Sequence, residues 1–113
     1  MGQGLSLAFF WHMHQPIYKD PITQQYLLPW ARLHSTRGYY DMVSILEDFP
    51  QIKATFNLTP SLLQQIVDYS SNPNISDIYL YYTTVPAADL TYEGKIFILR
   101  NFFKSNWDTM VKP

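Results

Sequence analysis

Apolar positions along the chain change their spacing several times, and each change marks an expected element. "LSLAFFWH", residues 5–12, is a short apolar run rich in aromatic residues, which is typical of a strand buried on both faces. "IKATFNL", residues 52–58, predicts a second strand. Between them, Ser35 or Thr36 is expected to cap a helix that Pro50 ends. Its apolar positions, at helical spacing, are Tyr39, Met42, Val43, Leu46 and Phe49.

The remaining segments predict a loop, two helices and one ambiguous stretch. Residues 13–34 hold three prolines and predict a loop of a length that is usually functional. Thr59-Pro60 is a typical helix start, and the helix is expected to reach about Tyr69. Residues 75–85 fit either a strand or an irregular packed segment. From Thr91, steps of four and three predict a third helix, with apolar positions Tyr92, Ile96, Leu99, Phe103 and Trp107.

The order strand, helix, strand, helix predicts an α/β fold built on a right-handed parallel unit. Parallel sheets are almost always covered on both faces, and only two helices are clearly available to cover these strands. A complete barrel of parallel strands and helices takes on the order of 250 residues. The 113-residue chain is therefore expected to be a fragment of such a barrel.

Polar residues follow both predicted strands where their apolar runs end. His12 and His14 share a face if the extended conformation continues, while Phe9 and Trp11 lie on the opposite, helix-packing face. Asn57 is the polar residue near the end of the second strand. Because the carboxyl ends of barrel strands carry the active site, the pattern predicts a site at this edge.

Spacing alone leaves three interpretations of the two histidines open. They can be hydrogen-bonded residues at the margin of a core. They can bind a metal ion, with His34 or Asp41 as a third ligand. In the third interpretation, the imidazoles and the Gln15 amide bind sugar hydroxyls beside Tyr18 and Trp30.

Composition and charge narrow the classes of partner. Aromatic residues make up 17% of the chain, which suits a carbohydrate cleft as well as an aromatic core. The net charge is −1, and positive and negative residues are dispersed along the chain, so no basic patch is expected that would bind nucleic acid or an anionic membrane. No apolar run is long enough to span a bilayer. The absence of cysteine and of a signal-peptide pattern favours a cytoplasmic location.

Three stretches strongly resemble the amino-terminal region of glycoside hydrolase family 57. They are "FWHMHQPIYKDP", "YLLPWARLHSTRGYYDMVSILEDFPQIKATFNLTPSLLQQIVDY" and "ILRNFFKSNWDTMVKP". The resemblance runs from about Leu5 to Pro113, and its most specific parts are the His-Gln-Pro and Leu-Pro-Trp-x-Arg-Leu-His motifs. Ile17 departs from the pattern, since an aromatic residue often follows that proline, and this affects one expected substrate contact.

The resemblance implies a fold and a mechanism. The family contains α-amylase-like enzymes, amylopullulanases, 4-α-glucanotransferases and branching enzymes, so the implied substrate is an α-glucan or maltooligosaccharide. The implied fold is an incomplete seven-stranded, TIM-like (β/α) barrel. Residues 1–113 would supply its first two β/α units and a helical insertion. The implied mechanism is retaining, with a glutamate nucleophile and an aspartate acid/base, and needs no metal or cofactor.

The resemblance also assigns site residues. His12 and His14 match a region whose histidines contact the reacting sugar, and Gln15 completes that motif. Trp30 is expected either to stack on a sugar ring or to pack in the core, and Arg32 either to orient a carboxylate from elsewhere in the barrel or to be solvated. The expected substrate-binding residues are His12, His14, Gln15, Trp30, Arg32, His34 and Asn57. No acidic residue here lies in a matching catalytic motif, so both catalytic carboxylates are expected beyond residue 113 and the fragment alone is expected to be inactive.

Two other classes compete with this hypothesis. Metal-dependent polysaccharide deacetylases and zinc mannosidases are built on related barrels, but they carry a first-strand aspartate or His-x-Asp where this chain has His-Met-His-Gln. The non-enzymatic alternative is a carbohydrate-binding fragment without catalytic residues. No nucleic acid or membrane partner is expected, and no oligomeric state is predicted.

Overall fold

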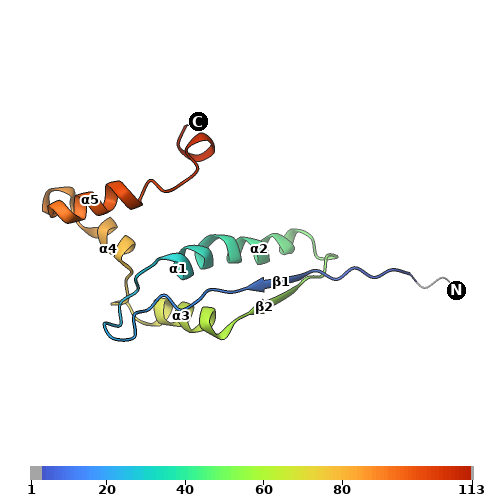
Figure 1. Ribbon diagram of the computed structural model, residues 1–113. Helices are drawn as coiled ribbons and strands as arrows, with labels where there is room; N and C mark the ends of the chain where they lie inside the picture. Colours follow the sequence, from blue (N-terminus) through green and yellow to red (C-terminus); the bar gives the residue numbers. More distant parts are fainter. Residues whose placement is uncertain (1–3, 113) are drawn as a thin grey trace.

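The computed structural model describes residues 4–112, in which two parallel strands are flanked by helices (Figure 1). The elements are β1 (Phe10–Met13), α1 (Trp30–His34), the π-helical η1 (Ser35–Tyr39), α2 (Tyr40–Ser44), the 3-10 helix η2 (Ile45–Asp48), β2 (Thr55–Leu58), α3 (Pro60–Ser71), α4 (Ile78–Thr84), the 3-10 helix η3 (Ala87–Asp89), α5 (Tyr92–Asn101) and the π-helical η4 (Trp107–Val111). Strand β1 pairs with β2 in parallel, and His12 lies opposite Asn57. The predicted α/β class is confirmed.

Both strands are shorter and more exposed than their apolar runs predict. Strand β1 starts at Phe10, because residues 4–9 have no neighbouring strand to pair with beyond the bond from the Thr55 amide to the Phe9 carbonyl. The expected burial on both faces is wrong for this chain: Phe10 is 63% exposed and Trp11 47%, whereas Met13 is buried. A two-stranded sheet has too few neighbours to bury apolar side chains on both faces.

The alternation of faces along β1 follows the prediction. Phe9 and Trp11 line a hydrophobic groove together with residues of the helix that connects the two strands. The other residues that line it are Met42, Ile45, Leu46, Ile52, Ala54 and Phe56. This leaves the opposite face to His12, as the strand period requires.

The first helix begins earlier than predicted. Ser35 and Thr36 do not cap it, because the helical stretch already starts at Trp30, directly after the buried Pro29. The Ser35 hydroxyl instead donates to the Ala31 carbonyl oxygen at 2.6 Å, a bond that serine makes inside helices. Burial of Pro29 and Ala31, rather than a capping side chain, sets the start of this helix.

Short-range capping signals account for the later helices. Thr59 is the extended N-cap of α3 with proline at its first position, as predicted. Residues 75–85 hold a helix, not a strand or an irregular segment, because the Asp77 carboxylate accepts the Leu80 amide at 2.9 Å and caps α4. Helix α5 follows Thr91 as predicted but ends at Asn101. The last predicted positions, Phe103 and Trp107, lie beyond it.

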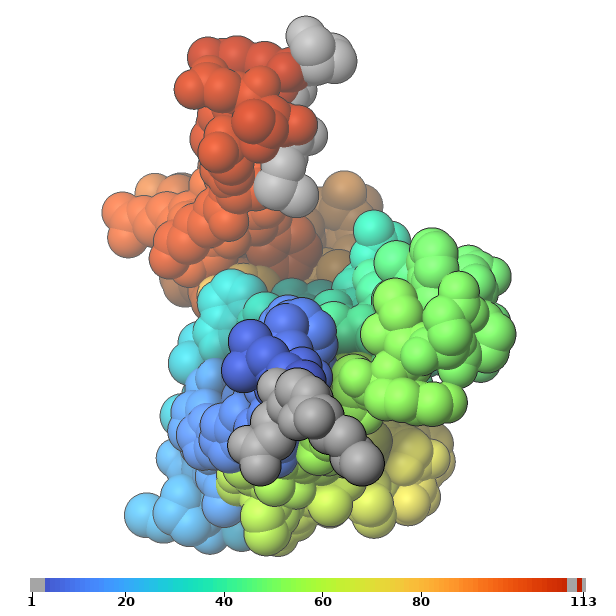
Figure 2. Space-filling model, turned by 90° about the vertical axis from the view of Figure 1, so that its right-hand side faces the viewer, coloured from blue at the N-terminus to red at the C-terminus, as the bar shows by residue number. Residues whose placement is uncertain are grey.

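The buried core is small for the length of the chain. Within residues 4–112, the buried hydrophobic side chains are Met13, Tyr26, Ala31 and Leu62. The Cα radius of gyration is 19.1 Å, whereas a compact chain of this length has about 13 Å. Helix α5 and the segment after it extend from the body that the strands and α1–α3 form (Figure 1), and Figure 2 shows the segment after α5 projecting beyond the rest of the chain. Much of the apolar surface of residues 4–112 is thus exposed.

We therefore predict that the isolated 113-residue chain self-associates and binds a hydrophobic dye instead of folding cooperatively. The reason is its two free strand edges and its exposed aromatic side chains. Size-exclusion chromatography and a thermal melt followed by near-UV circular dichroism measure this. A monomer with a single sharp melting transition would contradict the prediction.

Candidate functional site

The carboxyl ends of β1 and β2 bring three of the expected site residues together. His12 Nδ1 lies 2.7 Å from Asn57 Oδ1. The ring of His14 stacks on that of His12, with centroids 5.8 Å apart and planes at 15°. All three side chains are exposed to solvent. The strand ends therefore present a polar surface on which two imidazoles lie parallel.

Tyr39 joins this histidine pair to the second expected motif. Its hydroxyl donates to the His14 carbonyl oxygen at 3.0 Å and accepts from Gln15 Nε2 at 2.9 Å. Its ring centroid lies 6.0 Å from that of His34, which in turn lies 6.2 Å from Trp30. Six of the seven expected residues are thus connected, directly or through Tyr39.

Tyr39 itself was not among the expected site residues. It is the last residue of the π-helical turn η1, and such turns are frequent at functional sites. Its contacts with His14 and Gln15 join residues 24 and 25 positions apart. Helical periodicity marked Tyr39 only as an apolar position, so nothing local in the sequence identifies this hydroxyl contact.

Gln15 forms hydrogen bonds that hold the chain next to His14 in place. The side chain is buried, with both ends of its amide bound: Nε2 donates to Tyr39, and Oε1 accepts from the Tyr18 hydroxyl at 2.7 Å. The Gln15 carbonyl oxygen accepts from Ser61 at 2.8 Å. Burial raises the pKa of Tyr18, and Tyr39 adds to the shift, so the Tyr18 hydroxyl keeps the proton that it donates. These bonds fix the chain directly after His14.

Gln65, on α3, forms hydrogen bonds with the loop that follows His14. Its side chain is 1% exposed. Its Oε1 accepts the Tyr18 amide at 3.0 Å, and its Nε2 donates to the carbonyl oxygens of Pro16 and Ser61, each at 2.8 Å. The sequence signal for this role is a glutamine three positions after the fully buried Leu62, on the buried stripe of an amphipathic helix.

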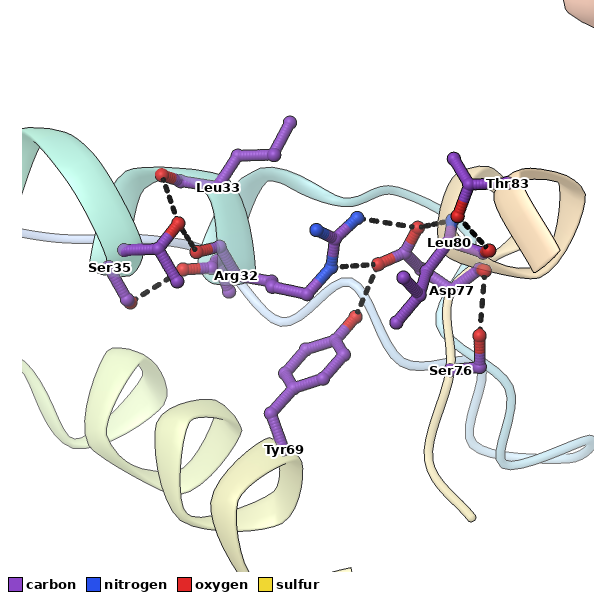
Figure 3. A network of polar contacts seen from close by, with 10 residues as sticks. Arg32, Leu33, Ser35, Tyr69, Ser76, Asp77, Leu80 and Thr83 are labelled. Atoms are coloured by element: carbon purple, nitrogen blue, oxygen red, sulfur yellow. Dashed lines mark hydrogen bonds and ion pairs between the residues drawn. The ribbon is translucent and has the colours of Figure 1, made fainter. Parts of the chain in front are cut away.

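Arg32 binds Asp77 (Figure 3). Its Nε donates to Oδ2 at 2.7 Å and its Nη2 to Oδ1 at 3.2 Å, a two-point contact. The Tyr69 hydroxyl also donates to Oδ2, at 3.2 Å. Arg32 thus orients the carboxylate of Asp77, whereas the expected partner was a carboxylate from elsewhere in the barrel. Its contact with substrate stays a prediction.

Asp77 is ionised despite being buried. Burial by itself would raise the pKa of Asp77, but the hydrogen bonds from Arg32 and from the Leu80 amide outweigh it and lower that pKa. The side chain has no exposed surface, whereas Arg32 is 22% exposed. One carboxylate therefore joins α1, α3 and the start of α4.

A second ion pair holds the other end of the loop. Lys19 Nζ lies 2.8 Å from Asp68 Oδ2, which also accepts the Tyr26 hydroxyl at 3.0 Å. The hydrogen bond from Lys19 lowers the pKa of Asp68. The centroid of the Tyr26 ring lies 4.6 Å from that of Tyr69, with the planes tilted at 36°, so the two ion pairs meet through an aromatic contact.

The metal-binding interpretation finds no ligand set in the described part of the chain. Across residues 4–112, no three His, Asp or Glu side chains come together as potential metal ligands. His34 lies near Tyr39 and Trp30, as described above.

Among the described helices, none is long and apolar enough to cross a bilayer.

Comparison with known proteins gives one match. The model of Glycosyl hydrolase family 57 matches residues 8–106, a range that includes every expected site residue. Searches of curated proteins and of solved structures found no match.

Gln65→Leu is expected to lower the free energy of unfolding of the intact protein by about 2–3 kcal/mol, because it removes part-buried hydrogen bonds to the Pro16 carbonyl oxygen and the Tyr18 amide. Gln64→Leu is the matched control, since Gln64 is an exposed glutamine on the same helix. Its effect should stay within about 0.5 kcal/mol. Urea unfolding measures both, and equal effects of the two variants would contradict the role given to Gln65.

Asp77→Asn is expected to lower the free energy of unfolding at neutral pH by about 2–3 kcal/mol, because it removes the charge that pairs with Arg32. The folded-state pKa of Asp77 is below its unfolded value. The stabilisation is therefore present above about pH 4 and is lost as the pH falls through the folded-state value.

The difference between wild type and Asp77→Asn should accordingly shrink at strongly acidic pH. Asp108→Asn is the control: its pairing with Lys112 is exposed and 3.5 Å long, so little change is expected. Urea unfolding over a pH series measures these differences. A difference between wild type and Asp77→Asn that is independent of pH would show that the ion pair is not its cause.

Proposed function

Because the chain belongs to glycosyl hydrolase family 57, we propose that it forms the amino-terminal part of the barrel of a retaining, α-glucan-active hydrolase or transglycosylase. The substrate is an α-glucan or a maltooligosaccharide, and the reaction takes place in the cytoplasm. The catalytic glutamate and aspartate come from polypeptide outside this chain. The family match supports the glycosidase class, and the arrangement of His12, His14 and Asn57 at the strand ends supports the finer assignment.

The observation that carries the proposal is the exposed imidazole pair at the strand ends. His12 and His14 lie parallel on a surface that also holds Asn57, where two parallel strands finish. A neutral imidazole donates a hydrogen bond from one nitrogen and accepts one at the other. A stacked pair of imidazoles therefore suits the closely spaced hydroxyl groups of a sugar ring. Exposure of both rings favours substrate contact over the core interpretation.

The incomplete sheet supports the barrel. Strands β1 and β2 form a two-stranded parallel sheet, and each has one edge that the described chain leaves unpaired. Further strands of a seven-stranded barrel would pair with these edges and cover side chains such as Phe10 and Leu58. In this arrangement the chain supplies two β/α units, and α4 and α5 form a helical insertion.

The acidic residues of the described chain support a nucleophile from elsewhere. Retaining catalysis needs two carboxyl groups about 5 Å apart. Asp68 and Asp77 are bound in ion pairs, and Asp20 accepts the amides of Ile22 and Thr23 in a turn, which lowers its pKa. These contacts give the three aspartates structural roles. Under this proposal the chain by itself is inactive, because both catalytic carboxylates come from polypeptide outside it.

His14→Ala in the intact enzyme is expected to lower kcat/KM on maltooligosaccharides at least tenfold, about 1.4 kcal/mol of transition-state stabilisation. The reason is the loss of a hydrogen-bonding group beside the reacting sugar. Gln64→Ala, an exposed residue on α3, is the control and should keep the wild-type rate. Wild-type kinetics in His14→Ala would contradict the substrate role of the histidines.

Metal analysis of the intact enzyme distinguishes the proposal from a deacetylase-like or mannosidase-like enzyme. A retaining glycosidase of this kind keeps its activity after treatment with a strong chelator. One zinc per protein, lost together with activity in His12→Ala, would reject the proposal in favour of metal-dependent chemistry.

A further inference from the structure

The contact between His12 and Asn57 determines which nitrogen of His12 carries the proton. The contact joins His12 Nδ1 to Asn57 Oδ1 at 2.7 Å, across residues that lie opposite each other in the parallel register. An amide oxygen only accepts hydrogen bonds, so Nδ1 is the donor. In the neutral ring the other nitrogen, Nε2, then carries a lone pair and no proton.

The surroundings of His12 hold the ring in place on two sides. His14 stacks on one face of it, with the planes at 15°. The backbone of His14 is fixed by Tyr39, and that of Asn57 by the strand pairing. His12 is an exposed residue, and its hydrogen bond with Asn57 occupies Nδ1 alone. Nε2 therefore remains available to an incoming hydroxyl group.

We propose that Asn57 is a positioning residue that holds His12 as the Nδ1–H tautomer, so that Nε2 accepts a hydrogen bond from a hydroxyl of the bound sugar. The inference rests on the proposed function and adds a chemical requirement to it: the sugar is the donor and His12 the acceptor. It also changes the role of Asn57, which was expected to touch substrate directly. Its carbonyl oxygen acts through His12 instead.

The tautomer is measured directly by nitrogen NMR of the intact enzyme labelled with ¹⁵N-histidine. A difference spectrum against His12→Gln isolates the signals of His12. At mildly alkaline pH we expect a protonated Nδ1 and an unprotonated Nε2. In Asn57→Leu, which keeps a similar volume but has no acceptor, the proton should move largely to Nε2. An unchanged spectrum in Asn57→Leu would overturn the proposal.

Kinetics on maltooligosaccharides supply the second measurement. Asn57→Leu should lower kcat/KM about tenfold, whereas Asn57→Asp keeps an acceptor oxygen and should retain both the tautomer and most of the activity at the same pH. Asn74 is an exposed asparagine in the loop before α4. Asn74→Leu is therefore the control and should leave both the tautomer and kcat/KM unchanged.

Two outcomes separate this inference from its premise. If Asn57→Asp keeps the tautomer but loses as much activity as Asn57→Leu, the Asn57 amide contacts substrate itself and the positioning role is overturned. If Asn57→Leu moves the proton while His14→Ala has wild-type kinetics, the role of Asn57 toward His12 is supported and the proposed function fails.

Discussion

The parallel register of β1 and β2 is the constraint on which the rest of the site depends. It places His12 opposite Asn57, and it lets the Thr59 amide reach the Met13 carbonyl oxygen at 3.2 Å, where α3 begins. Because side chains alternate along a strand, a slip of one residue would turn His12 to the helix-packing face and bring Trp11 to the polar one. The contact between His12 and Asn57 therefore exists in one register only.

Polar side chains, more than apolar packing, hold the loop between β1 and α1. Gln15 and Gln65 satisfy the groups on either side of the turn after His14, and both are buried. Farther along, Asp68 and Asp77 bind the loop and α1 to α3 and α4. Buried polar networks of this kind specify one geometry because every member needs its partners. The loop thus has a fixed path although it has little regular secondary structure.

Local signals in the sequence predicted the α/β class, the two strands and the helices α3 and α5. Strand alternation also placed the histidines on one face. The start at Trp30 and the helix α4 were missed, because the first depends on burial and the second on a single capping carboxylate. Tyr39, Gln65 and Asp77 were not expected near the site residues, since their contacts join positions 24 to 49 residues apart. Periodicity assigns faces, but it does not identify partners.

Asp77 binds groups from two separate parts of the chain, α1 and α4. One of its oxygens accepts both Arg32 Nη2 and the Leu80 amide, so the first turn of α4 shares an anchor with α1. If α1 moves away, Asp77 loses its countercharge, and the carboxylate that caps the first turn of α4 is left buried without a cation, which is costly. Docking of α1 therefore stabilises the start of a helix more than forty positions later in the chain.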